Sequence, residues 1–331
     1  MKTVFPASMA SMVTMFTITN AALAFLCLGA GAAAAQPYPT KPVRLIVPYA
    51  PGGGVDIMAR ILAPKFTAAM GQQFVVDNRS GAGAILGTDL VAKATADGYT
   101  LLFTNPAHVS NPSLNAKLPF DAVRDFTAVG LAGLSSSVLV VHPATAAKSV
   151  KELVALAQAK PGQLNYASAG VGSAIFLAME LFKSTAKIDV VHIPYKGAGP
   201  AMTDVIGGQV PLMFIAISPS LPHIKAGRLR ALGTSSAKGL GVLPDVRPIA
   251  DTYTGFDHTD WYGIMAPANT PAAIVNRVNR EINAALAAPD VRDRVLAMGA
   301  ESVGGSAQEF DARIKNEIGK WAKVFNKNAA R

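Results

Sequence analysis

The feature that most constrains the fold is a regular alternation of short, β-branched apolar runs with longer amphipathic segments. The runs read as buried strands and lie at 43–47, 74–76, 101–103, 138–141, 190–193, 212–215 and 263–265. Alternation of this kind predicts an α/β protein in which helices flank mainly parallel sheets. The chain has 331 residues, a length that accommodates roughly two domains.

Several of the amphipathic segments carry start signals for helices. Capping boxes are expected where Ser149 precedes Glu152 and where Ser306 precedes Glu309. Thr270 and Pro271 predict an N-cap followed by a proline in the first helical position. Pro64 breaks the pattern, because it falls inside a helix expected over 56–70. Either that helix kinks there or Pro64 opens a second helix.

The first 35 residues are typical of a secretory signal peptide. They hold one charged residue, Lys2, then an apolar run, and end with small residues that include Ala33 and Ala35. We expect cleavage near Ala35/Gln36 and export. Cys27 is the only cysteine and lies in this segment, so the mature chain would have no disulfide and no thiolate metal site.

The charge pattern excludes some classes of partner. Lys and Arg number 30 against 21 Asp and Glu, a formal net charge of +9. The basic residues are dispersed and are not interleaved with aromatic residues, so nucleic-acid binding is not expected. A diffuse positive field favours small anions, although a merely soluble basic surface explains the charge equally well.

Two glycine loops are the candidate binding elements. Gly52, Gly53 and Gly54 follow the first strand and precede a helix, where backbone N–H groups can face an anion. Ser168 to Ser173 form a second strand-to-helix loop that includes Gly172. The first loop does not have the spacing of a nucleotide-binding motif. Each could instead be a simple turn, with Asp56 or Ser173 capping the helix that follows. Two such helix N-termini facing each other would suit a small carboxylate.

Signals for catalysis are poor. The chain has no nucleophile elbow, no paired zinc-binding histidines and no cysteine–histidine cluster, and its five histidines are scattered. Asp257 and Asp260 lie in a polar turn and are expected to be solvated. We therefore predict no catalytic residues, no metal and no cofactor.

An ordered set of short motifs resembles the receptors of tripartite tricarboxylate transporters, also called the Bug family. The resemblance covers residues 38–325. The motifs begin with Tyr38-Pro39-x-Lys41-Pro42-Val43-Arg44 and Pro51-Gly52-Gly53-Gly54-x-Asp56; further ones lie at 76–83, 97–102, 118–121, 167–173, 194–197, 226–232, 243–246 and 261–263.

This resemblance implies a periplasmic binding protein of two α/β lobes that close on a ligand like a flytrap. Lobe 1 would comprise residues 36–139 and 255–331, and lobe 2 residues 140–254, with the chain crossing twice and the ligand cleft between the lobes. Backbone amides, hydroxyls and bridging waters would hold a small carboxylate. The residues that match the family's binding positions are Gly52, Gly53, Gly54, Asp56, Thr104, Asn105, Ser168, Gly172, Ser173 and Ile215.

Some positions depart from the family pattern. Phe176 stands where a histidine is frequent, and Pro211 where an acidic residue is common. The strand that follows ends in the apolar pair Ile215 and Ala216. The ammonium group of an amino acid ligand would need a nearby carboxylate as its partner. We therefore hypothesise an aliphatic or aromatic carboxylate as the ligand.

The implied partners are a carboxylate ligand and the permease subunits of a tripartite membrane transporter, with the receptor a monomer. Two alternatives stay open: a receptor that signals to a membrane kinase, and an exported hydrolase.

Overall fold

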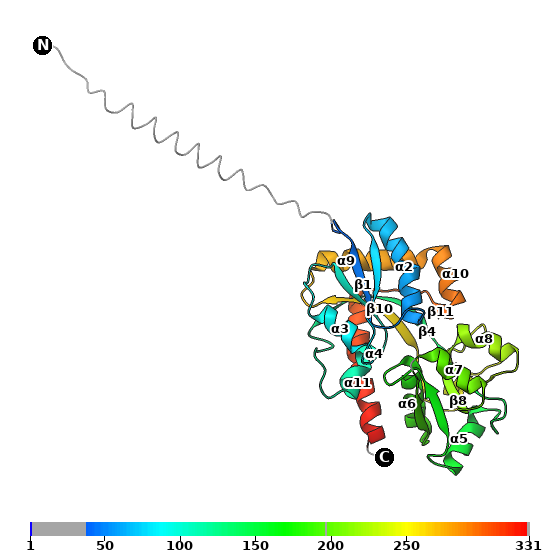
Figure 1. The fold of residues 1–331 in the computed structure, drawn as a ribbon. Helices are drawn as coiled ribbons and strands as arrows, with labels where there is room; N and C mark the ends of the chain where they lie inside the picture. Colours follow the sequence, from blue (N-terminus) through cyan, green and yellow to red (C-terminus); the bar gives the residue numbers. More distant parts are fainter. Residues whose placement is uncertain (2–37, 196, 330–331) are drawn as a thin grey trace. The chain divides into compact units, whose positions relative to one another are not determined.

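The computed structural model of the chain describes Met1, residues 38–195 and residues 197–329. The chain divides into two units, Met1–Thr40 and Lys41–Arg331. Every helix and strand described below lies in the second unit (Figure 1). The predicted signal peptide and its cleavage position lie outside the described residues.

The first sheet has six strands in the order β11-β4-β10-β3-β1-β2. Its parallel part joins β1 to β2 and to β3, whereas β10 runs antiparallel to both of its neighbours, β3 and β4. The strands are β1 (Val43–Val47), β2 (Phe74–Asn78), β3 (Thr100–Thr104), β4 (Phe126–Ser135), β10 (Asp260–Pro267) and β11 (Ala300–Glu301).

The second sheet has five strands in the order β7-β6-β8-β5-β9. β6 is parallel to β7 and β8, and β5 is antiparallel to β8 and β9. The strands are β5 (Ser137–Val141), β6 (Asn165–Ser168), β7 (Val191–Pro194), β8 (Leu212–Ala216) and β9 (Arg230–Thr234). The α/β class with two sheets is confirmed, but the pairing is more mixed than expected, because β4, β5, β9 and β10 at the crossings pair antiparallel with their neighbours.

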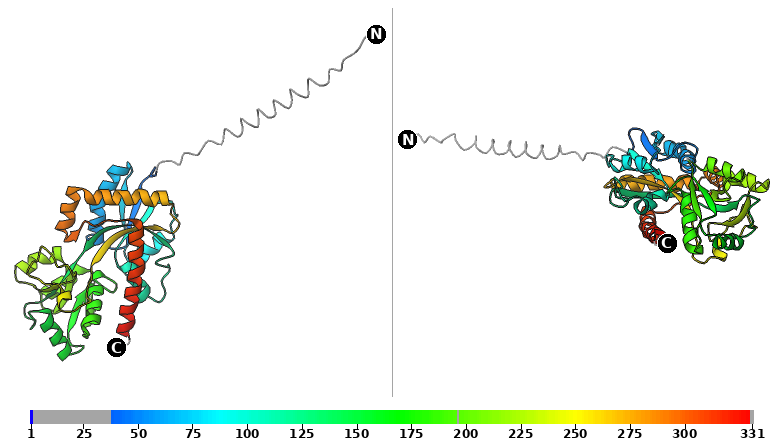
Figure 2. Two further views of the ribbon diagram at one scale, coloured as in Figure 1. Left: turned by 180° about the vertical axis from the view of Figure 1, so that it is seen from behind. Right: turned by 60° about the horizontal axis from the view of Figure 1, so that its bottom comes forward.

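Helices surround both sheets (Figure 1). The first sheet is packed by α2 (Gly54–Met70), α3 (Ile85–Ala92) and α9 (Ala272–Ala287), while α4 (Ala107–Leu114) packs on α11 (Ala307–Ala329) and α10 (Pro289–Ala297) lies against α2 and α9. The second sheet carries α5 (Val150–Ala159), α6 (Ala174–Ala186), α7 (Ala198–Ile206) and α8 (Ile217–Lys225), and a 3-10 turn, η1, spans Ile249–Asp251. In Figure 1 the red helix α11 extends beside α6, which it contacts, and the left view of Figure 2 shows α11 from behind.

The local start signals are confirmed with one exception. Ser149 and Ser306 accept hydrogen bonds from the N–H groups of Glu152 and Glu309, as the capping boxes require. Thr270 does not cap α9: its hydroxyl donates to the carbonyl of Pro267, and Pro271 precedes the helix instead of opening it. The helix around Pro64 continues without a break as α2.

The chain passes from the first sheet to the second between β4 and β5, and returns between β9 and β10. The strand β5 lies wholly in the second sheet, so the predicted lobe boundary at 139/140 would fall inside it. The positions of the lobe boundaries stay a prediction. We call the groups of elements around the two sheets the first and second lobes.

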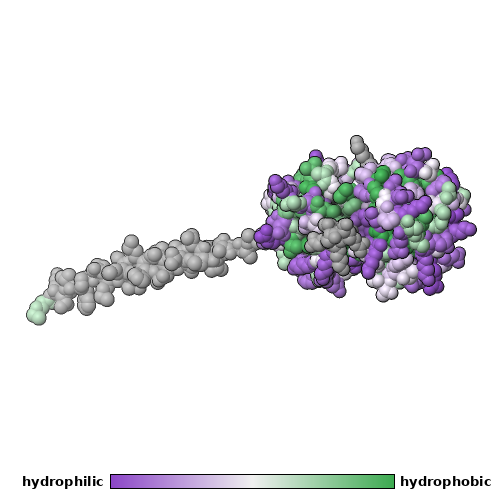
Figure 3. Space-filling view, turned by 90° about the horizontal axis from the view of Figure 1, so that it is seen from below, coloured by the Kyte–Doolittle hydropathy of each residue, from purple (hydrophilic) through white to green (hydrophobic). Residues whose placement is uncertain are grey.

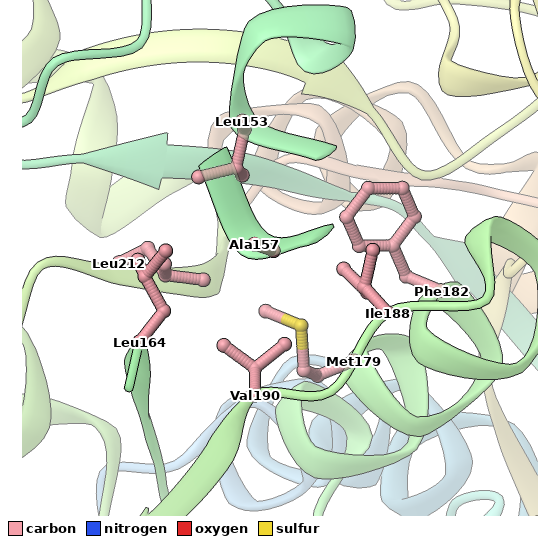
Figure 4. Close-up of a pocket in the computed structure, with 8 residues that line it drawn as sticks. All are labelled: Leu153, Ala157, Leu164, Met179, Phe182, Ile188, Val190 and Leu212. Carbon is pink, nitrogen blue, oxygen red and sulfur yellow. The ribbon is translucent and has the colours of Figure 1, made fainter. Parts of the chain in front are cut away.

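Both lobes are packed with large apolar side chains. Trp261, Phe103 and Phe66 are fully buried around the first sheet, as are Tyr166 and Phe214 in the second. Figure 4 shows a small apolar packing gap of the second lobe, with no room for a water molecule. It is lined by Leu153, Ala157, Leu164, Met179, Phe182, Ile188, Val190 and Leu212. This gap is core, and a ligand would find no polar group in it.

The surface is mixed. On the face drawn in Figure 3, hydrophilic residues are interspersed with small apolar groups. Within the described part of the chain, none of the helices has the length and apolar character needed to cross a membrane.

Candidate functional site

The first glycine loop joins β1 to α2 and is stabilised by hydrogen bonds to the Asp56 carboxylate in the first turn of α2. Gly52 has φ +87°, a left-handed conformation that favours glycine, and its N–H donates to the Asp56 carboxylate (2.9 Å). The same buried carboxylate accepts hydrogen bonds from Arg60 and Asn78 at 3.0 Å each. Burial alone would raise the pKa of Asp56, but these hydrogen bonds and the Arg60 charge lower it. Asp56 therefore holds the loop in place.

The start of α2 leaves backbone donors free. A helix has no internal acceptor for its first N–H groups, and Ile57 is the first residue to bond back, to the carbonyl of Gly53. Among the described residues, no protein group accepts from the N–H of Gly53 or Gly54. A Cβ on Gly54 would lie 2.6 Å from the Tyr262 hydroxyl, so only glycine fits there. The loop thus presents N–H groups at the positive end of a helix.

The residues after β3 lie next to this loop. The side-chain oxygen of Asn105 accepts from the hydroxyl of Tyr49 (2.5 Å) and from the N–H of Ala107 (3.1 Å). The Thr104 hydroxyl is fully buried and has no hydrogen-bond partner among the described residues. The Tyr49–Asn105 bond ties the β1 loop to the end of β3.

The second glycine loop is held together by its own hydroxyls. Ser168 accepts from the N–H of Gly170 (3.0 Å), and the Ser173 hydroxyl donates to the carbonyl of Gly170 (2.7 Å). The Ser173 hydroxyl also accepts from the N–H of Phe176 (3.3 Å) and so caps α6. Gly172 has φ +79° and is buried. Both hydroxyls therefore shape the loop, and the start of α6 offers N–H groups as α2 does.

The second glycine loop contacts the first lobe at a third loop, residues 81–84. Gly81, Ala82, Gly83 and Ala84 all have positive φ, a run that turns this loop sharply before α3. The carbonyl of Gly83 accepts from the Asn111 side chain (3.0 Å). A Cβ on Gly83 would lie 3.6 Å from the carbonyl oxygen of Val171, and one on Gly172 3.5 Å from the Asn111 side-chain oxygen. Asn111 and Gly83 of the first lobe thus contact the second glycine loop.

Asp260, which was expected to be exposed to solvent, is half-buried. Asp260 opens β10 opposite Ser135 and accepts from the N–H of Trp261 (3.0 Å). Burial raises the pKa of its carboxyl to about 8, and the negative charge of Glu317 adds to the rise. The nearby charge of Asp260 in turn helps to raise the pKa values of Tyr49 and Tyr262, behind burial as the larger cause. Asp260 is therefore half-buried where a solvated side chain was expected, whereas Asp257 is exposed as expected.

Of the predicted site residues, Gly52, Gly53, Gly54, Asp56, Thr104 and Asn105 come together at the ends of β1 and β3. Ser168, Gly172 and Ser173 form the corresponding group at the end of β6. Ile215 is different. It lies in β8 opposite Val138 of β5, is only 1% exposed and belongs to the apolar core. Its role toward a ligand, like that of the other nine, stays a prediction.

Residues that the sequence did not single out are Tyr49, Asn111, His192 and Tyr262. Each acts through a partner distant in the sequence, such as Asn105 for Tyr49 (56 residues away) or Ser168 for His192 (24 residues away). No local motif could have indicated them. Among the described residues, no group of three or more His, Cys, Asp or Glu side chains could hold a metal ion.

Comparison with known proteins identifies the class of protein that this fold and site define. The model of the tripartite tricarboxylate transporter receptor family matches residues 58–329. The chain belongs to this family of receptors, as its motifs indicated.

Three solved structures are similar over nearly their whole length. A protein of Rhodopseudomonas palustris, Rpa4515 with adipate, is 33% identical with a TM-score of 0.80, covering 88% of this chain and 98% of that one. The periplasmic binding protein BugD is 31% identical with a TM-score of 0.78 and coverages of 88% and 98%. MatC of Rhodopseudomonas palustris with bound malate is 30% identical with a TM-score of 0.77 and coverages of 87% and 100%. The chain thus has the two-lobed fold of periplasmic solute-binding proteins.

Proposed function

We propose that this protein is a receptor that captures a small organic carboxylate between its lobes and delivers it to a tripartite membrane transporter. One observation carries the proposal: each lobe has a glycine loop that ends at a helix N-terminus, and the loop of the second lobe contacts the first lobe at Asn111 and Gly83. N–H groups of both loops can bind one ligand at the same time only when the lobes are closed. The ligand therefore stabilises the closed form.

The donors assigned to the ligand are backbone N–H groups. Gly53 and Gly54 supply them at the start of α2, and Gly172 supplies them in the loop before α6. Thr104 and Asn105 lie at the end of β3, beside the first loop. We assign them to holding this loop or to binding the waters that bridge to the ligand. Asp56, Ser168 and Ser173 take part as residues that hold the loops, since their side chains are hydrogen-bonded inside them. A carboxylate bound this way gains charge-assisted hydrogen bonds of about 1.5–3 kcal/mol each.

The ligand class follows from the side chains. The end of β8 is apolar at Ile215 and Ala216, which leaves an amino-acid ammonium group without a carboxylate partner there. Structures similar to this chain have been solved with adipate and with malate, both simple dicarboxylates. We therefore assign simple aliphatic or aromatic carboxylates as the ligands in preference to amino acids.

The remaining assignments follow the same proposal. The protein acts in the periplasm as a monomer after cleavage near Ala35/Gln36. Its lobes are those expected from the sequence, with the boundary at 139/140 moved to precede β5, so that this strand stays whole in the second lobe. Its partners are the permease subunits of the transporter. We assign no catalytic activity, because the Ser168 side chain is fully buried and a substrate cannot reach its hydroxyl.

A thermal-shift screen of the purified protein tests this function. The panel contains adipate, malate, citrate, benzoate, aspartate and glutamate. A ligand at 100 times its Kd adds about 2.7 kcal/mol to the free energy of unfolding, enough for a measurable rise in Tm. We expect rises with simple carboxylates only. A rise with aspartate or glutamate alone contradicts the ligand class, and no rise with any acid, after refolding to remove bound ligand, contradicts the receptor function.

A further inference from the structure

The second glycine loop depends on a histidine outside it. His192 lies in β7, opposite Tyr166 of β6. Its ring is stacked on the ring of Tyr166 (4.9 Å between centroids, 23°) and is tilted against Phe176 of α6 (4.9 Å, 51°). From this position, the Nε2 atom lies 2.6 Å from the hydroxyl oxygen of Ser168. The rings thus fix the imidazole, and the imidazole reaches the first residue of the loop.

The hydrogen bonds around Gly170 decide which way this contact runs. The carbonyl of Gly170 already accepts from both the hydroxyl (2.7 Å) and the N–H (3.2 Å) of Ser173, so its two lone pairs are used. The Ser168 hydroxyl lies at a longer 3.3 Å from the same carbonyl, whereas it accepts the N–H of Gly170 at 3.0 Å. The Ser168 hydroxyl therefore donates its hydrogen bond to Nε2 of His192. This arrangement requires a neutral imidazole with Nε2 unprotonated.

We propose that His192 is a positioning residue of the binding site: by accepting a hydrogen bond from the Ser168 hydroxyl, its neutral ring locks the loop of residues 168–173 in the conformation that presents its N–H groups to the ligand. The effect on ligand affinity rests on the proposed function, but the effect on the loop does not. Ser168 would lose its fixed orientation without this acceptor, and Gly170 would then lose the fixed acceptor for its N–H.

The charges around His192 agree with a neutral ring. Burial lowers the pKa of His192; among its charged neighbours, Glu180 opposes this shift and Lys183 adds to it. Both belong to α6, and the Glu180 carboxylate accepts hydrogen bonds from Lys183 (2.9 Å) and from the Tyr166 hydroxyl of β6 (2.8 Å). Because the folded-state pKa lies below the ordinary value, the locked loop is complete above about pH 6.5 and is lost as the pH falls through the lowered pKa.

Two substitutions separate positioning from packing. His192→Gln removes the ring but places an amide oxygen near the position of Nε2, so the acceptor for Ser168 is kept. His192→Phe keeps an aromatic ring between Tyr166 and Phe176 but has no acceptor. His142→Gln is the matched control, because His142 follows β5 at the opposite end of the same sheet, beside Pro211.

The direct test is amide hydrogen exchange of Gly170 and Ser173, expressed as protection factors at pH 7.5 without added ligand. We expect roughly fivefold lower protection in His192→Phe, the effect of one hydrogen bond, and wild-type protection in His192→Gln and His142→Gln. Unchanged protection in His192→Phe, or a loss in His192→Gln alone, overturns the proposal and leaves His192 a packing residue.

Calorimetric titration with adipate then tests the link to binding. The Kd of His192→Phe should rise about fivefold, and the affinity ratio of wild type to His192→Gln should fall between pH 7.5 and pH 5. Comparing two proteins at each pH cancels the protonation of adipate itself. If adipate binds and neither change appears, the positioning role in binding is wrong. If adipate does not bind but the exchange pattern holds, the ligand assignment fails and the role of His192 in the loop stands.

Discussion

At the scale of single residues, Asp260 shows how burial sets the behaviour of a charged group. The residue is half-buried at the start of β10, and burial raises the pKa of its carboxyl to about 8. An unfolded chain releases this proton near the ordinary value of about 3.9. Between these two pH values the folded state holds a proton that the unfolded state has lost, so the contribution of Asp260 to stability falls as the pH rises from 4 to 8.

The substitution Asp260→Asn should therefore raise Tm at pH 8 by about 2 °C or more and leave it unchanged at pH 4. The asparagine oxygen can still accept the N–H of Trp261 but has no charge to bury. Melting curves of both proteins at the two pH values measure this. An equal difference in Tm at pH 4 and pH 8, or a lower Tm of Asp260→Asn at pH 8, would show that the carboxyl is not held protonated.

At the scale of elements, the N-terminus of α2 is held by Asp56. The substitution Asp56→Ala leaves Gly52, Arg60 and Asn78 without their buried acceptor, and we expect a loss of about 3 kcal/mol in the free energy of unfolding. Asp56→Asn keeps an acceptor and should lose less. Urea denaturation measures both.

The control for Asp56 is Asp290→Ala. This substitution removes an exposed ion pair between Asp290 of α10 and Lys65 of α2, the helix that also contains Asp56. Such a pair contributes little because solvent screens it, so the stability of this variant should match that of the wild type. A loss as large in Asp290→Ala as in Asp56→Ala would mean that the first glycine loop does not depend on its carboxylate.

Elements were also the scale at which the sequence was most informative. Ser149 and Ser306 could be assigned as caps because their partners lie three residues away, and the glycine loops because strand, loop and helix follow one another directly. The prediction of an N-cap at Thr270 was wrong by one position. The Thr270 hydroxyl donates to the carbonyl of Pro267 instead, and Pro271 is the residue that precedes α9. Asp260, Asn111 and His192 could not be predicted, because their burial and partners depend on contacts between distant segments. The antiparallel strands at the crossings depend on tertiary contacts in the same way.

At the scale of the whole molecule, the lobes also touch through helices outside the glycine loops. Phe325 of α11 is stacked on Phe176 of α6 (6.2 Å between ring centroids), and the Ser218 hydroxyl of α8 donates to the carbonyl of Ala297 at the end of α10 (3.0 Å). These contacts join elements of the two sheets. They therefore stabilise this arrangement of the lobes, in which we propose that both loops bind one ligand.

The substitution Phe325→Ala should weaken ligand binding by about two- to tenfold, since an aromatic pair contributes about 0.5–1.5 kcal/mol and its loss favours the open form. Calorimetric titration measures the change. Phe74→Leu is the control: it removes a ring that contacts Phe66 within the first lobe, so Tm should fall while Kd stays constant. An unchanged Kd in Phe325→Ala would exclude a role of this contact in closure.

The central claim is that backbone N–H groups of the glycine loops hold a carboxylate, and a matched pair of variants at Gly53 tests it most directly. Gly53 has φ −79°, which suits proline, and a Cβ there would come no closer than 3.9 Å to the Ala50 carbonyl oxygen. Gly53→Ala keeps the N–H and Gly53→Pro removes it. Calorimetric titration with the carboxylate that raises Tm most should give wild-type affinity for Gly53→Ala and at least about tenfold weaker binding for Gly53→Pro. Equal affinities of the two variants would contradict the claim.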